Sequence, residues 1–124
     1  MVYLDTQSVI WLYEGKREKF SNPVQELITA NELSVSPMVM LELHYLMECK
    51  RIAHTPNKVL TILGNDFGVT LDRVDFAAVI DVAAHESWTR DPFDRIIVAH
   101  AKKNDAVLIT SDRNILKHYK KAIV

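Results

Sequence analysis

Short runs of apolar residues alternate along the chain with longer segments in which apolar residues recur every three or four positions. The short runs are rich in valine, isoleucine and leucine and lie at 2–4, 33–36, 68–71, 106–110 and 122–124. Unbroken apolar runs of this length are typical of parallel strands that are covered on both faces of a sheet. Because segments with helical spacing separate them, the pattern predicts right-handed βαβ connections. The expected fold is a three-layer α/β/α sandwich with a mostly parallel sheet of four or five strands.

Proline positions support the helices between these strands. Three prolines each follow a residue that commonly caps a helix, in the pairs Asn22-Pro23, Ser36-Pro37 and Thr55-Pro56. Proline is well tolerated at the first position of a helix, where its missing N–H has no intrahelical partner. With 124 residues and 48% apolar content, the chain has the size and the core-forming residues of one domain over residues 1–124.

Charge and cysteine content narrow the function classes. The formal net charge is −1, which excludes the strongly basic surface that by itself marks a nucleic-acid-binding protein. The single cysteine, Cys49, forms neither an internal disulfide nor a thiolate metal site, and we expect it to be buried. No apolar run approaches the roughly 18 residues that a membrane span requires. We therefore expect a cytoplasmic protein without a membrane segment.

Acidic residues stand at unusual places in this pattern. Asp5 directly follows the first predicted strand, and Asp112 follows the fourth by two residues, so both belong at the sheet edge where α/β proteins bind ligands. Glu42 lies inside the apolar helical segment "PMVMLELHYLM", and Asp94 heads the apolar stripe of "RDPFDRIIVAHA". Burying one unpaired carboxylate costs several kcal/mol, so these side chains require a partner or a proton.

Structural roles explain some of these acids equally well. Asp91, three residues before Asp94, resembles the first residue of a capping box, and we favour a capping role for it. Asp5, Asp94 and Asp112 are also explained as anions near helix N-termini, an effect worth about 0.3–1 kcal/mol each. For Glu42 the alternative is a buried ion pair with an arginine such as Arg95 or Arg113.

Taken together, several carboxylates at one sheet edge indicate a bound cation, because they repel one another unless they are protonated, paired or metal-bound. Oxygen ligands without nearby cysteine or histidine favour Mg²⁺ or Mn²⁺ over zinc. Such an ion also binds phosphate oxygens, which makes hydrolysis of phosphodiester bonds the natural chemistry.

Four segments, "YLDT", "SPMVMLEL", "RDPFDRIIVAHA" and "LITSD", resemble in order and spacing the motifs of PIN domains. The chain closely resembles, nearly end to end, the single-domain VapC-type ribonuclease toxins of toxin–antitoxin pairs. The resemblance implies a metal-dependent endoribonuclease in which one or two Mg²⁺ or Mn²⁺ ions are bound by Asp5, Glu42, Asp94 and Asp112, with Asp91 in a supporting role. One position departs from the subgroup, which often has glutamine where this chain has His100; we expect a surface or packed helix residue there.

Residues beside the acids are candidates for supporting and binding roles. Thr6 and Ser111 are placed to bind a carboxylate or a metal-bound water, although helix capping explains either equally well. Three arginines flank the acids in the sequence and are the candidates for phosphate contact or for holding the carboxylates in place: Arg90, Arg95 and Arg113.

The resemblance implies RNA as the substrate, a cognate antitoxin protein as a partner and a homodimer. A catalytically silent PIN-like module that binds RNA or protein through the same edge is the alternative. A receiver-type phosphoacceptor also gathers aspartates at strand ends, but it predicts no glutamate inside an apolar helix. It also requires a lysine after a late strand, where this chain reads "TSDRN".

Overall fold

Five short parallel strands form the centre of the structure, a computed structural model that describes residues 1–124. The strands are β1 (Val2–Leu4), β2 (Leu33–Val35), β3 (Thr70–Leu71), β4 (Val107–Ile109) and β5 (Ala122–Ile123). They lie in the order β3-β2-β1-β4-β5, and every neighbouring pair is parallel. Each of the five apolar runs of the sequence contains one of these strands, so the predicted sheet is confirmed.

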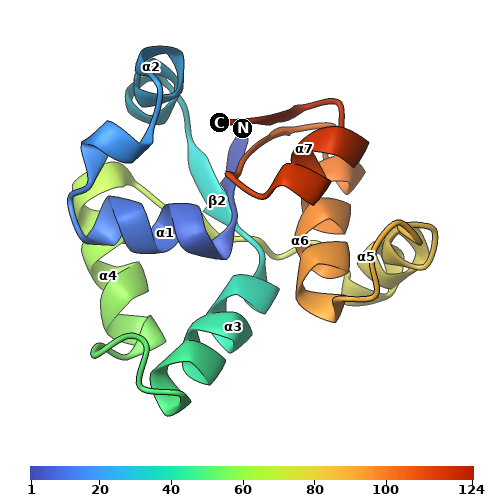
Figure 1. Ribbon diagram of the computed structural model, residues 1–124, viewed down its shortest axis with the longest axis horizontal. Coiled ribbons are helices and arrows are strands. Elements are labelled where there is room, and N and C mark those ends of the chain that lie inside the picture. Colours follow the sequence, from blue (N-terminus) through green and yellow to red (C-terminus); the bar gives the residue numbers. More distant parts are fainter.

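Helices cover the sheet on both sides. They are α1 (Thr6–Tyr13), α2 (Asn22–Ala30), α3 (Pro37–Glu48), α4 (Pro56–Phe67), α5 (Phe76–Ala83), α6 (Pro92–Lys103) and α7 (Arg113–His118), with a 3₁₀ turn at Arg17–Lys19. Figure 1 shows α1, α2 and α4 on one side of β2, with α5, α6 and α7 on the other. This arrangement confirms the α/β sandwich. None of the helices has both the length and the apolar character needed to cross a membrane.

Side-chain caps fix where the helices begin. Ser36 accepts a hydrogen bond from the backbone N–H of Met38 at 3.1 Å, and Thr55 accepts one from Lys58 at 3.2 Å. Such caps contribute about 1 kcal/mol each. At α2 the predicted boundary is one residue late, because the capping residue is Ser21 and Asn22 is already helical.

The core lies between the sheet and the helices that pack on it. Leu4, Val39, Val98 and Leu108 are completely buried, and they come from β1, α3, α6 and β4. Helix α5, which has no counterpart among the predicted elements, packs on α6 through a smaller apolar cluster.

The structure tests the expectations for two single residues, His100 and Cys49. His100 is buried in α6, and its Nδ1 lies 2.9 Å from the Ser36 hydroxyl and 3.2 Å from the Ile96 carbonyl oxygen, so it is a packed helix residue that joins α6 to the start of α3. The expectation of a buried Cys49 is wrong. Cys49 is exposed because α3 ends just before it, and the helix buries Val39 and Leu43 on another face.

The order of the strands creates a binding crevice between β1 and β4. The chain passes from β1 outward to β2 and β3 and then returns to the other side of β1 to form β4. At such a switch point the connections leave in opposite directions, which opens a crevice at the carboxyl ends of the strands. Leu4 pairs with Ile109 at this edge, so the segments after β1 and β4 begin side by side.

Replacing the buried Leu108 of β4 by alanine is expected to lower the free energy of unfolding by about 2–5 kcal/mol, because it leaves a cavity in the core. The matched control is Leu41→Ala on α3, whose side chain is 55% exposed and whose loss should change that free energy by less than about 0.5 kcal/mol. Urea denaturation measures both values, and equal losses for the two variants would contradict the packing described here.

Candidate active site

The four acids singled out in the sequence line one cavity of about 310 Å³ at the crevice between β1 and β4. They come from distant parts of the chain: Asp5 caps α1, Glu42 lies in α3, Asp94 is in the first turn of α6, and Asp112 caps α7. These four helices surround the middle of the molecule in Figure 1. The other residues that line the cavity are Thr6, Gln7, Ile10, Leu46, Arg51, Ile97 and Ser111.

Asp5 is the most buried of the four acids, with 7% of its surface exposed. Its Oδ1 accepts a hydrogen bond from the backbone N–H of Ser8 at 2.8 Å, and its Oδ2 accepts one from the Thr110 hydroxyl. Burial raises the pKa of Asp5, the hydrogen bonds from Thr110 and Ser8 oppose this, and the charge of Asp112 adds to the increase. The capping role considered for Asp5 is therefore real, and the carboxylate performs it from inside the cavity.

Glu42 accepts a hydrogen bond from the Thr6 hydroxyl, so the supporting role expected of Thr6 has a geometric basis. Burial raises the pKa of Glu42, the bond from Thr6 opposes the increase, and nearby carboxylates add to it. The alternative of an ion pair with an arginine is wrong. Arg95 instead donates from its Nε to the Glu86 carbonyl oxygen at 2.8 Å, and none of the ion pairs in the structure includes Arg113.

Of the four acids, Asp94 has the fewest contacts within the protein that stabilise its negative charge. Its half-buried carboxylate accepts no side-chain or backbone hydrogen bond and forms no ion pair. Burial raises its pKa to about 7, and neighbouring carboxylates contribute in the order Asp91, Asp112, Glu42 and Asp5. A cation in the cavity would reverse this effect by favouring the ionised form.

Like Asp5, two further aspartates cap helices through one carboxylate oxygen each. Asp112 Oδ1 accepts from the backbone N–H groups of Asn114 and Ile115 at 2.8 and 3.0 Å. Asp91 Oδ1 accepts from Phe93 and Asp94 at 2.8 and 3.4 Å, which confirms the capping role favoured for it. Asp91 does not line the cavity, whereas Asp112 does and keeps its Oδ2 free of hydrogen bonds.

The donor set of the cavity fits a hard divalent cation. Carboxylates are its only ionisable acids, and neither histidine nor cysteine lines it, which is the ligand chemistry of Mg²⁺ or Mn²⁺. In the side-chain positions of the structure, no three acids converge on a single point. Binding of an ion would therefore require side-chain rotation, most simply of Asp94, which is not engaged elsewhere.

Other candidate residues are distributed unevenly around this cavity. Ser111 lines it and makes no side-chain hydrogen bond. The three arginines proposed for phosphate contact do not line it; Arg90 donates instead to the Ser87 carbonyl oxygen at 3.0 Å. The arginine that does line it is Arg51, just beyond the end of α3, which the sequence analysis missed. The feature of the sequence that could have identified Arg51 is its position just after the helix that carries Glu42.

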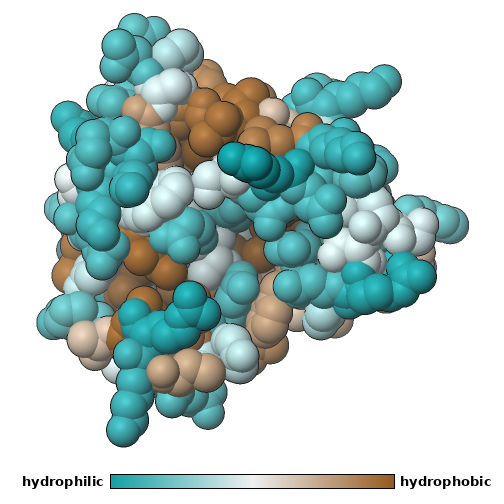
Figure 2. Space-filling view, viewed as in Figure 1, coloured by the Kyte–Doolittle hydropathy of each residue, from teal (hydrophilic) through white to brown (hydrophobic).

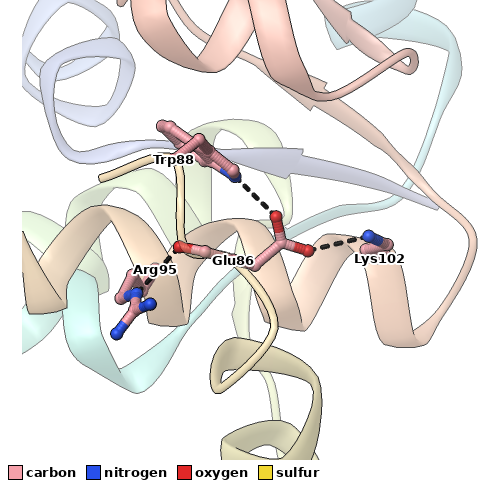
Figure 3. A network of polar contacts seen from close by, with 4 residues as sticks. All are labelled: Glu86, Trp88, Arg95 and Lys102. Atoms are coloured by element: carbon pink, nitrogen blue, oxygen red, sulfur yellow. Dashed lines mark hydrogen bonds and ion pairs between the residues drawn. The ribbon is translucent and has the colours of Figure 1, made fainter. Parts of the chain in front are cut away.

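A polar network around Glu86 holds the segment that leads into α6 (Figure 3). The buried carboxylate accepts hydrogen bonds from Lys102 Nζ at 2.8 Å and from Trp88 Nε1 at 2.6 Å. Burial alone would raise the pKa of Glu86, but these donors outweigh burial and lower it. The Trp88 ring stacks on the His118 ring of α7 with centroids 5.0 Å apart. The network thus connects the segment before α6, the helix that carries Asp94, with the end of α7, the helix that Asp112 caps.

Glu86→Ala is expected to lower the free energy of unfolding by about 1–3 kcal/mol, because the partly buried Trp88 N–H loses its acceptor and the Lys102 ammonium loses its partner. The control is Glu14→Ala, which breaks an exposed ion pair with Lys16 and should cost less than about 1 kcal/mol. Urea denaturation distinguishes the two, and a loss at Glu86 no larger than at Glu14 would show that the network adds little.

Asp94→Asn is expected to weaken the pH dependence of stability in metal-free protein. A carboxyl with a pKa of about 7 in the folded chain and an ordinary value of 3.8 when unfolded stabilises the fold below 3.8. That contribution is lost as the pH rises through 7. In EDTA, the wild type should therefore lose more unfolding free energy between about pH 5 and pH 8 than the variant does. Urea titrations at both pH values test this, and equal losses would contradict it.

Comparisons with known proteins show which family the chain resembles. The PIN domain family model matches residues 2–121. VapBC2 from Rickettsia felis, solved bound to a DNA fragment from its promoter, has a TM-score of 0.70 and 16% identity over 100% of this chain and 98% of that chain.

A toxin–antitoxin complex from Klebsiella pneumoniae has a TM-score of 0.71 and 16% identity over 100% of this chain and 97% of that chain. VapBC-1 from nontypeable Haemophilus influenzae has a TM-score of 0.63 and 19% identity over 98% of this chain and 92% of that chain. At these identities the likeness concerns the fold alone. None of the curated proteins compared with the chain matches it significantly. Because the family model spans nearly the whole sequence, the chain belongs to the PIN domain family.

Proposed function

We propose that the chain is a metal-dependent endoribonuclease that hydrolyses phosphodiester bonds of RNA and acts as the toxin of a toxin–antitoxin pair. The observation that carries this proposal is the meeting of four carboxylates in one cavity, where Asp94 has a pKa of about 7 and no compensating donor. Membership of the PIN family and the toxin–antitoxin complexes among the structural neighbours support it.

In this proposal Asp5, Glu42, Asp94 and Asp112 hold one or two Mg²⁺ or Mn²⁺ ions. A bound ion makes water a better nucleophile and offsets negative charge on the phosphoryl oxygens. We assign the orientation of the attacking water to Asp94 or to Oδ2 of Asp112, which accept no other hydrogen bond.

Residues in and beside the cavity prepare the site for this chemistry. Thr110 and Thr6 fix the orientations of Asp5 and Glu42 by donating hydrogen bonds to their carboxylates. The apolar side chains of Ile10, Leu46 and Ile97 form part of the wall. They reduce access of water, which strengthens electrostatic interactions inside the cavity.

A catalytically silent module remains the second candidate. It is favoured by one observation, that no three acidic side chains converge on one point. Such a module would use the same cavity to bind RNA or protein without cleaving a bond.

An apolar groove of about 380 Å³ beside the acidic cavity supports an antitoxin as the partner. The two hollows share Ile10 and Arg51, and the groove is lined by further side chains that include Tyr13, Leu43 and Val59. Figure 2 shows hydrophobic side chains gathered between α1 and α4 on this face. A protein segment in the groove would extend directly into the acidic site. The homodimer stays a prediction.

Asp5→Asn and Asp94→Asn are each expected to reduce Mn²⁺-dependent cleavage of single-stranded RNA by about a hundredfold or more, because each removes a charged ligand and proton acceptor. The matched control is Asp81→Asn, which makes the same change at an exposed position of α5 outside the cavity and should cleave at the wild-type rate. Initial rates with a labelled oligonucleotide give the comparison, and circular dichroism verifies the fold.

Equal cleavage by the wild type and both site variants would refute the enzyme proposal. RNA binding by the wild type without cleavage in Mn²⁺ or Mg²⁺ would instead favour the silent module.

A further inference from the structure

Arg51 is the single cationic side chain that lines the acidic cavity, and it also lines the adjoining apolar groove. It therefore stands where the two hollows meet. The side chain is exposed and takes part in none of the ion pairs or side-chain hydrogen bonds of the structure. Its guanidinium group is thus free for a ligand and does not act as an internal counter-ion for Glu42 or Asp94.

The backbone of Arg51 is hydrogen-bonded to the helix that carries Glu42. Its N–H donates to the Leu46 carbonyl oxygen at 2.8 Å, and the preceding Lys50 adopts the left-handed conformation with φ of 59°. This turn follows α3, the helix that carries Glu42, and places Arg51 at the cavity. Arg51 is therefore tied to the catalytic edge by a helix end and a backbone hydrogen bond.

The charge of the cavity explains why a cation is needed at this place. When a single divalent ion is bound, it compensates two of the four carboxylate charges, and the cavity still repels a polyanionic strand. The three arginines near the acids in sequence do not line the cavity. A guanidinium group binds phosphate through two parallel charge-assisted hydrogen bonds, which gives orientation as well as attraction.

We propose that Arg51 binds the phosphate of single-stranded RNA next to the scissile one and sets the register of the strand in the cavity. The proposal rests on the nuclease function proposed above and identifies a substrate-binding residue for it. Binding at this phosphate is the same in the ground state and in the transition state, so its loss affects KM and leaves kcat nearly unchanged.

The test compares Arg51→Ala, Arg51→Lys and the control Arg73→Ala, which removes the same charge from an exposed arginine outside the cavity. RNA binding is measured by fluorescence anisotropy in an Asp94→Asn background over a range of NaCl concentrations with Mn²⁺ present. Cleavage is measured in the wild-type background. We expect Arg51→Ala to raise Kd and KM about tenfold, the effect of a lost hydrogen bond to a charged group.

The slope of log Kd against log salt concentration should fall in magnitude by about 0.7 in Arg51→Ala, the value for one phosphate contact on a single strand. Arg51→Lys should keep the slope, because it keeps the charge. It should lose part of the affinity for RNA, because lysine cannot form the two parallel hydrogen bonds that a guanidinium group makes to phosphate. Arg73→Ala should retain both the affinity and the slope.

Equal affinity and equal slope for the Arg51→Ala and Arg73→Ala variants would overturn the proposal. A change in Mn²⁺ affinity of Arg51→Ala with unchanged RNA binding would also overturn it, because Arg51 would then act as a counter-ion for the acids. If the wild type cleaves no RNA, the nuclease function fails, and the anisotropy data still decide whether Arg51 contacts RNA.

Discussion

Repulsion between carboxylates at the carboxyl ends of β1 and β4 is the constraint on which the organisation of this protein depends. The strand order forces the segments after β1 and β4 to begin side by side, which brings Asp5 and Asp112 to one crevice. Helices α3 and α6 add Glu42 and Asp94. Burial is the main cause of the raised pKa values of Asp5, Glu42 and Asp94, and neighbouring negative charge adds to each increase, most of all at Asp94.

The fold tolerates this repulsion because it satisfies the acids unequally. Hydroxyl groups of Thr110 and Thr6 hold Asp5 and Glu42, and the helix N-termini stabilise Asp5 and Asp112 through caps. Asp94 receives no such help, so the remaining electrostatic cost is concentrated on one side chain. Of the four carboxylates, that of Asp94 would be stabilised most by a bound cation. A raised pKa of an acid in a cleft is typical of functional residues.

The positions of the helices that carry the acids are fixed by contacts away from the cavity. His100 joins α6 to the capping residue of α3, and the Glu86 network connects the segment before α6 with α7 through the stacked rings of Trp88 and His118. These contacts position α3 and α6, which carry Glu42 and Asp94, and α7, which Asp112 caps. Rigid elements behind a site are what hold reacting groups in a productive geometry.

The sequence predicted the sheet and the placement of the four acids because both follow from local patterns. An acid directly after a buried parallel strand must lie at the carboxyl edge, and Glu42 was conspicuous because its neighbours on the helix are apolar. The partners of the acids were not predictable in the same way. Adjacent residues on a helix point about 100° apart. Arg95 therefore points in a different direction from its neighbour Asp94 and donates a hydrogen bond to Glu86. The hydrogen bond from Thr110 to Asp5 and the place of Arg51 at the cavity arise from tertiary structure, which no spacing along the chain encodes.

In the proposed function, the wall shared by the acidic cavity and the apolar groove connects RNA cleavage with its inhibition by an antitoxin. Ile10 and Arg51 belong both to the acidic cavity and to the apolar groove. A protein segment anchored in the groove would therefore cover the guanidinium group that we assign to an RNA phosphate, before it reached any carboxylate. Exclusion of the substrate would then not require contact with the metal-binding acids. It would follow from occupation of the groove, whose apolar lining supplies the affinity that a site dominated by negative charge lacks.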